Sequence, residues 1–203
     1  MIDLRIAVLG GTFDPVHMGH VKMAKDAIEE FNLDKLIVVP NGNPPHKMDS
    51  EQADFKHRFN MLEIAFKGMD KVHISDYEAS ENKPSYSLHS MRHFRSLYGE
   101  DTAFIIGADS LFTIHKWYEY EKLLSENTFI VFRRRGDGDL SDIVEKYKKC
   151  YGAKILISDM DYVDISSTDI RNGIAENTFS GDVIPAGVEE YIRKNGLYGG
   201  KNG

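Results

Sequence analysis

Residues 10–20 read GGTFDPVHMGH, and this stretch decides how the rest of the chain is interpreted. It follows the short apolar run 5–9 and leads into apolar side chains at helical spacing, namely Val21, Ala24, Ile28 and Phe31. A strand that passes through glycines into a helix is the first unit of a parallel α/β sheet. Glycines adopt positive φ and let the backbone approach an anion, and the first helical amides carry the positive end of the helix dipole. The stretch therefore predicts a phosphate-binding junction at Gly10 and Gly11.

The remaining sequence repeats this alternation of short apolar runs and amphipathic stretches. Predicted strands cover residues 5–9, 35–39, 71–75, 102–106, 127–132 and 154–157, and predicted helices lie within residues 21–31, 55–66, 88–97, 140–151 and 188–195. Polar loops at 41–50 and 133–139 each follow a predicted strand. The pattern predicts a doubly wound, mostly parallel α/β sheet with helices on both faces, in one domain over residues 1–203. In such a sheet the loops after the strands build the ligand site.

Composition and charge exclude several classes of protein. The chain has 203 residues, of which 41% are apolar and 28% charged, so disorder is excluded. Its apolar runs are far shorter than the roughly 20 residues that cross a bilayer, and no basic leader precedes them, which predicts a cytoplasmic protein without membrane partners. A net charge of -7 argues against nucleic acid as the main partner. The single cysteine, Cys150, fits a reducing compartment. The sequence does not determine the oligomeric state and is compatible with a homo-oligomer.

Two histidines give the first junction its chemistry. His17 and His20 are three residues apart, so in a first helical turn they share one face and both direct ring N–H groups toward a phosphate. Two alternatives remain open: a pair of metal ligands completed from elsewhere, or a glycine turn beside two structural histidines. The chain has no G-x-x-x-x-G-K-[ST] motif, and the first loop lacks the third glycine of G-x-G-x-x-G. A P-loop NTPase and a hydride-transfer Rossmann enzyme are therefore disfavoured.

Motifs along the chain resemble those of the nucleotidyltransferase superfamily that carries H-x-G-H. Residues 10–20 resemble its first signature, and residues 165–171, which read ISSTDIR, resemble its second, I-S-S-T-x-I-R. The internal motifs PPHK at 44–47, PSYS at 84–87, GAD at 107–109 and Trp117 resemble one branch, the bacterial nicotinate-nucleotide adenylyltransferases. The resemblance extends to residues 183–198. Where that branch usually reads S-Y-T, this chain has Ser85-Tyr86-Ser87, which keeps the hydroxyl.

The resemblance implies a Rossmann-like fold and transfer of an adenylyl group from ATP to nicotinate mononucleotide, a step of NAD biosynthesis that releases pyrophosphate. It implies catalytic roles on the ATP phosphates for His17, His20 and Arg171. The implied ATP-binding residues are Gly10, Gly11, Thr12, Phe13, Gly107, Asp109, Ser167 and Thr168. The implied mononucleotide-binding residues are His46, Lys47, Ser85, Tyr86, Ser87, Trp117, Tyr118 and Arg133. Mg²⁺ is expected on the ATP phosphates, with no metal site made by the protein itself.

Simpler interpretations remain open for several of these residues. Ser166 three residues before Asp169 is also a helix N-cap, which leaves Arg171 an ordinary surface residue. In the simpler interpretation, residues 44–47 are a solvated turn and residues 133–135 are a solvated charged run. Trp117 is then an aromatic residue of the core. Alternative functions are phosphopantetheine adenylyltransferase, a cytidylyltransferase, or a nucleotide-sensing module without turnover. The chain is too short and acidic for an aminoacyl-tRNA synthetase.

Overall fold

The computed structural model describes residues 4–42, 52–79, 85–133, 138–160, 165–178 and 181–199. Its strands are β1 Ile6–Gly11, β2 Lys35–Pro40, β3 Val72–Ile74, β4 Ala103–Gly107, β5 Thr128–Phe132 and β6 Lys154–Ile157. Its α-helices are α1 Met18–Glu30, α2 Phe55–Ala65, α3 Ser87–Tyr98, α4 Ala108–Thr113, α5 Tyr120–Glu126, α6 Ser141–Tyr151, α7 Ser167–Ala175 and α8 Ala186–Lys194. Two short 3-10 turns, η1 Ile114–Lys116 and η2 Gly181–Val183, complete the described elements.

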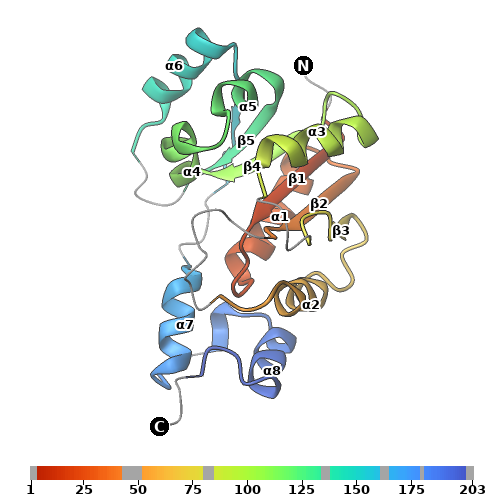
Figure 1. The fold of residues 1–203 in the computed structure, drawn as a ribbon, viewed down its shortest axis with the longest axis vertical. Coiled ribbons are helices and arrows are strands. Elements are labelled where there is room, and N and C mark those ends of the chain that lie inside the picture. Colours follow the sequence, from red (N-terminus) through yellow and green to blue (C-terminus); the bar gives the residue numbers. More distant parts are fainter. Residues whose placement is uncertain are drawn as a thin grey trace.

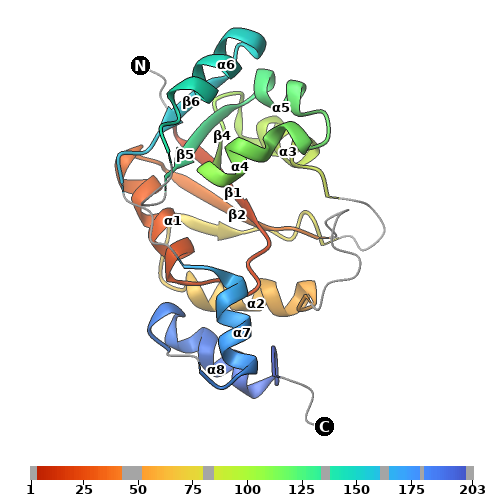
Figure 2. The ribbon, with the colours of Figure 1, turned by 90° about the vertical axis from the view of Figure 1, so that its left-hand side faces the viewer.

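The six strands form one sheet in the order β3-β2-β1-β4-β5-β6, and every pairing in it is parallel. The chain builds outward from β1 to β3, returns to the other side of β1 with β4, and then builds outward to β6 (Figures 1 and 2). The strand order reverses between β1 and β4, which is where ligands bind in sheets of this type. The predicted doubly wound, parallel α/β fold is confirmed.

Alternating side chains of the strands pack into two hydrophobic cores, one on each face of the sheet. Ala7 and Leu9 of β1 pack with α1, α2, α7 and α8, whereas Val8 packs on the other face with α3, α4, α5 and α6. This follows from the period of two along a strand, which sends successive side chains to opposite faces. The central strands are apolar at nearly every position because both faces are covered.

The first junction differs in detail from the sequence expectation. Strand β1 continues through Gly10 and Gly11, which pair with Val39 and Pro40, and neither glycine has a positive φ. Space is what requires glycine here: a Cβ on Gly11 would lie 2.9 Å from the ring of Phe13. The left-handed residue of the turn is Phe13 itself, with a φ of 51°.

Two short helices were not predicted from the sequence. Helices α4 and α5 lie between β4 and β5 and contain six and seven residues. Helices of one or two turns do not repeat their apolar positions often enough to show helical periodicity. The last predicted helix does begin after Pro185, as α8, and a left-handed Gly196 follows its end. Within the described residues, no helix is both long and apolar enough to cross a bilayer.

Candidate active site

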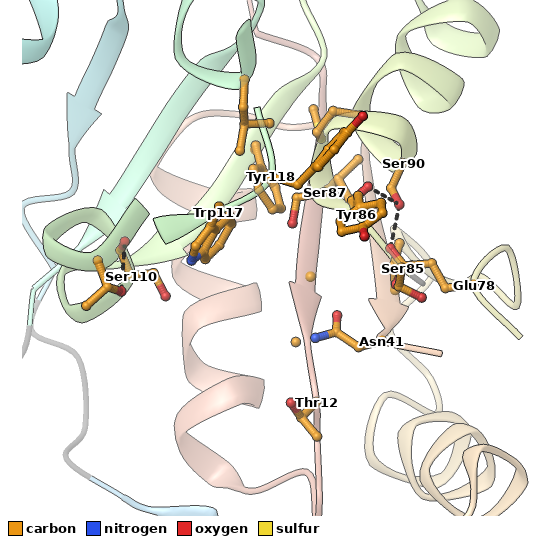
Figure 3. A pocket seen from close by; sticks show the side chains of 18 of the residues that line it. Thr12, Asn41, Glu78, Ser85, Tyr86, Ser87, Ser90, Ser110, Trp117 and Tyr118 are labelled. Atoms are coloured by element: carbon orange, nitrogen blue, oxygen red, sulfur yellow. Dashed lines mark hydrogen bonds between the residues drawn. The ribbon is translucent and has the colours of Figure 1, made fainter. Parts of the chain in front are cut away.

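A pocket of about 670 Å³ opens at the strand-order reversal, on the sheet face covered by α3, α4 and α5. Eight of the residues predicted to bind ligand line it, namely Gly10, Gly11, Thr12, Ser85, Tyr86, Ser87, Trp117 and Tyr118. In Figure 3 the aromatic side chains of Trp117, Tyr118 and Tyr86 lie on one side of this space, and Asn41 and Thr12 lie on the other. The structure thus brings the first strand and the PSYS and tryptophan motifs together.

The predicted histidine pair does not line this pocket; it lies at the start of α1, in the same β1–α1 connection as the lining residue Thr12. His17 is the N-cap residue and is 2% exposed, and its ring stacks on the ring of His20 with centroids 3.7 Å apart. The backbone N–H of His17 donates to Nδ1 of His20 at 3.3 Å, so a neutral His20 ring carries its proton on Nε2. The ring of Phe13 contacts the His20 ring in a T-shaped arrangement, with the two centroids 4.9 Å apart. These contacts fix the direction in which the Nε2–H of His20 donates.

The second predicted signature meets the first directly. Arg171 donates from Nη1 to the backbone oxygen of Asp14 at 2.7 Å, and Ser167 donates its hydroxyl hydrogen to the oxygen of Pro15 at 3.0 Å. Ser166 caps α7 by accepting from the backbone N–H of Asp169 at 3.4 Å. The helix-cap interpretation is therefore correct, and the cap sets the direction of the helix that carries Arg171. The role of Arg171 at a ligand site stays a prediction.

Aromatic side chains form one wall of the pocket. Trp117 is half-buried, packs on the apolar core beside Phe104 with ring centroids 6.4 Å apart, and also lines the pocket. Tyr86 and Tyr118 stack with centroids 4.2 Å apart, and His89 contacts both rings edge-on. Trp117 therefore has core contacts as well as a surface that faces the ligand space.

Gly107 and Asp109 are predicted residues that do not line the pocket. Gly107 ends β4 and Asp109 is in the first turn of α4, where its carboxylate folds back so closely that a Cβ on Gly107 would lie 2.5 Å from its Oδ1. Arg133 is exposed at the end of β5 and is not among the residues that line the pocket. His46 and Lys47 lie outside the described residues.

Three groups in the site were missed by the sequence analysis. Lys116 is the one cationic side chain among the described residues that line the pocket. Glu78 also lines it and accepts a hydrogen bond of 2.5 Å from the buried hydroxyl of Ser90. Gly42 packs so tightly that a Cβ would lie 1.6 Å from the backbone oxygen of Glu78. The position of Lys116, directly before the predicted Trp117, is a signal that could have identified it.

Arg58 of α2 is a fourth unpredicted residue, and it is 2% exposed. Its guanidinium donates to three backbone oxygens, those of Thr12 at 2.9 Å, Ala53 at 3.0 Å and Gly42 at 3.4 Å. Burial lowers the pKa of Arg58, and the nearby Asp14 carboxylate opposes that change. Arginine side chains are rarely buried to this extent, so nothing local in the sequence marks Arg58.

The described residues contain no group of three or more His, Cys, Asp or Glu side chains that could together hold a metal ion. The groups that the site directs toward a ligand are instead imidazole, guanidinium, hydroxyl and backbone N–H donors. Such donors suit phosphate oxygens. These donors can bind polyanions, and the aromatic-walled pocket lies next to them along β1 and Thr12.

Comparisons with known proteins agree with this geometry. The sequence model of the cytidylyltransferase-like family matches residues 8–173. A probable nicotinate-nucleotide adenylyltransferase of Clostridium acetobutylicum is 40% identical over 195 residues, covering 95% of this chain and 98% of that protein. The corresponding protein of Clostridium tetani is 38% identical over 199 residues, with coverage of 95% and 98%. Among solved structures, the Plasmodium falciparum nicotinic acid mononucleotide adenylyltransferase complexed with NaAD has a TM-score of 0.79 at 25% identity, covering 96% of this chain and 97% of that one.

Proposed function

The chain belongs to the cytidylyltransferase-like family and to the nicotinate-nucleotide adenylyltransferases, and from this premise we propose how its residues divide the work of adenylyl transfer. The chain is a nucleotidyltransferase that transfers the adenylyl group of ATP to nicotinate mononucleotide. Nicotinate adenine dinucleotide and pyrophosphate are the products. We further propose that residues 1–203 act as one domain, since all six described strands join one sheet.

The junction of β1, α1 and α7 is proposed to bind ATP. His17 and His20 stack at the start of α1, and Arg171 is anchored to the same loop. These groups place two imidazoles and one guanidinium near the first helical amides, which favour anions. Gly10, Gly11, Thr12, Phe13, Ser167 and Thr168 shape this junction, and Gly107 with Asp109 at the end of β4 is proposed to receive a ribose.

The aromatic pocket is proposed to bind the mononucleotide. Trp117 offers its face to the pyridine ring, while the hydroxyls and backbone of Ser85, Tyr86 and Ser87 face the ring carboxylate. Tyr118 stacks on Tyr86 and closes that wall. Lys116 adds a positive charge to the same pocket, which favours an acid over an amide. Roles for His46, Lys47 and Arg133 stay predictions from the resemblance.

The chemistry needs alignment more than proton transfer. A phosphate oxygen of the mononucleotide attacks the α-phosphorus of ATP, and the bond to the pyrophosphate oxygen breaks. The attacking phosphate is already anionic, so no general base is required, and the enzyme acts by holding two polyanions in line and stabilising charge that develops. His20 and Arg171 have the donors and the fixed directions for this task.

Mg²⁺ is proposed to arrive on the triphosphate. It would neutralise phosphate charge there, with water completing its shell, because the donor set around the described site is cationic and suits phosphate rather than metal. The cytoplasmic location and a homo-oligomer stay predictions.

One observation carries the proposal most strongly: Arg171 of the second motif is hydrogen-bonded to the loop of the first motif, beside the aromatic pocket. The test is to incubate the protein with ATP and Mg²⁺ plus either nicotinate mononucleotide or phosphopantetheine, and to measure pyrophosphate and the adenylylated product. Dinucleotide formation is expected from the pyridine substrate only. Product from phosphopantetheine, or ATP binding without turnover, would contradict the proposal.

A further inference from the structure

Asp14 is a buried carboxylate that the proposed chemistry does not use. It is 4% exposed and lies in the loop between β1 and α1. Its Oδ1 accepts the hydroxyl hydrogen of Tyr198 at 2.5 Å and the backbone N–H of Ala53 at 3.3 Å. Its Oδ2 lies 3.9 Å from Nη1 of Arg171. A buried carboxylate is costly unless it is well hydrogen-bonded, so these contacts hold the loop in a defined conformation.

The same loop residue directs Arg171 through its backbone. Nη1 of Arg171 donates to the Asp14 oxygen at 2.7 Å, and Nη2 donates to Oγ1 of Thr168 at 3.3 Å. These bonds use two of the five guanidinium N–H groups and fix the plane of the fork, while the side chain remains 31% exposed. A long arginine side chain held in this way loses less conformational freedom when it meets a phosphate.

Tyr198 brings the C-terminal segment into contact with the loop. It follows α8 in a left-handed conformation, with a φ of 61°, and its hydroxyl reaches a residue 184 positions earlier in the chain. Burial and the Asp14 carboxylate both raise the pKa of Tyr198, so the hydroxyl stays protonated and donates. Helix α8 is itself fixed on α2, because the Tyr191 hydroxyl contacts Nδ1 of His57 at 3.0 Å and accepts from Asn60 at 2.9 Å.

We propose that Asp14 and Tyr198 are positioning residues for Arg171, so that the segment 181–199 holds this guanidinium ready for the ATP phosphates. The pocket lies on the face covered by α3, α4 and α5, whereas α7, α8 and Tyr198 pack on the opposite face. The contact between Tyr198 and Asp14 therefore links the helices on this opposite face of the sheet to Arg171. It rests on the ATP role proposed above for Arg171.

Tyr198→Phe removes one hydroxyl and keeps the ring, and it is expected to lower kcat/KM for ATP about tenfold, in proportion to one charge-assisted hydrogen bond. The KM for nicotinate mononucleotide is expected to stay unchanged. Tyr191→Phe is the matched control, because it removes a hydroxyl that joins the same segment to α2 without reaching Asp14. Equal kinetic losses in the two variants would show a general structural role and overturn the proposal.

A double-mutant comparison tests whether Tyr198 acts through Arg171. In an Arg171→Ala background, Tyr198→Phe is expected to cause no further loss in kcat/KM for ATP. A second tenfold loss there would overturn the proposal. Asp14→Asn provides a second variant if Tyr198→Phe fails to fold: it keeps an acceptor for Tyr198 and removes the charge facing Arg171, and normal ATP kinetics in it would also count against the proposal. Normal ATP dependence in Arg171→Ala alone would instead refute the proposed role of Arg171 in binding ATP.

Discussion

The His20 ring is held by the backbone N–H of His17 and by the ring of Phe13, so its removal tests the phosphate role most sharply. His20→Ala is expected to keep the fold and to lower turnover at least about 100-fold, since one donor aimed at developing charge contributes roughly 3 kcal/mol. Turnover and the circular dichroism spectrum are measured together. His73→Ala, on the exposed side of β3, is the control and should retain full turnover. A folded His20→Ala protein with normal turnover would contradict the assignment.

Trp117 contacts both the core and the pocket, and its two roles give different signatures. Trp117→Ala is expected to raise the KM for nicotinate mononucleotide by about two- to tenfold, as expected for losing a stacking contact of about 0.5–1.5 kcal/mol, with a smaller effect on ATP. Trp117→Phe should recover part of the loss. If Trp117→Ala lowers the Tm and leaves both KM values unchanged, the packing against Phe104 is its main role.

Lys116 adds a charge to a pocket whose other proposed donors for the nicotinate carboxylate are neutral. The hydroxyls and backbone N–H groups of Ser85 to Ser87 are those neutral donors. The pocket adds Lys116, so Lys116→Met is expected to reduce the kcat/KM ratio of acid to amide mononucleotide severalfold, in keeping with an attraction of about 1 kcal/mol in a partly exposed pocket. An unchanged ratio would return selectivity to the neutral donors.

Among the elements, the segments that follow β2 and β3 touch each other at Gly42 and Glu78, and Glu78 lines the pocket. Gly42 follows β2 and packs against the backbone of Glu78. A Cβ placed on Gly42 would also lie 3.0 Å from Oγ of Ser85. Gly42→Ala therefore forces these segments apart and is expected to raise the KM for the mononucleotide and to destabilise the fold by about 1–3 kcal/mol. Gly138→Ala is the control, since nothing lies within 4 Å of its added Cβ.

Long, periodic elements were predictable, and tertiary contacts were not. The strand 154–157 matches β6, and Pro185 marks the start of α8, because apolar period and proline act locally. Both signatures at the site were also visible as ordered motifs. The contacts of Arg58, Asp14 and Tyr198 were not predictable, since they depend on groups as far as 184 residues away in the chain. The positive φ expected at the glycines of the first junction was wrong because β1 extends through them and the turn falls on Phe13.

For the molecule as a whole, one ion pair between helices gives a testable dependence of stability on pH. Arg92 of α3 donates to Glu126 at the end of α5 at 2.8 Å and 2.5 Å. The hydrogen bonds from Arg92 are the main cause that lowers the pKa of Glu126 below its ordinary 4.5. A carboxylate whose pKa is lowered on folding adds stability above its unfolded pKa, and this stability is lost as the pH falls through the folded pKa.

Arg92→Gln should therefore lower the Tm at pH 7, and the difference from the unmodified protein should vanish under acid conditions below the folded pKa of Glu126. Thermal unfolding followed by circular dichroism across this range provides the measurement. Lys154→Gln, at an exposed lysine of β6, removes the same charge and serves as the control. A Tm difference that persists unchanged into acid would show that Arg92 contributes through packing rather than through the ion pair.

Arg58 binds two loops, the β1–α1 loop and the β2–α2 connection, through three of their backbone oxygens and not through their side chains. A residue that binds main-chain atoms leaves its partners' identities unconstrained, so positions such as Thr12 and Ala53 can change in sequence without losing this anchor. The arrangement separates two kinds of mutational tolerance: the loops can diversify toward new ligands, while the buried guanidinium that supports them cannot be replaced. Libraries built to alter ligand preference should accordingly vary the loop side chains and keep Arg58 constant.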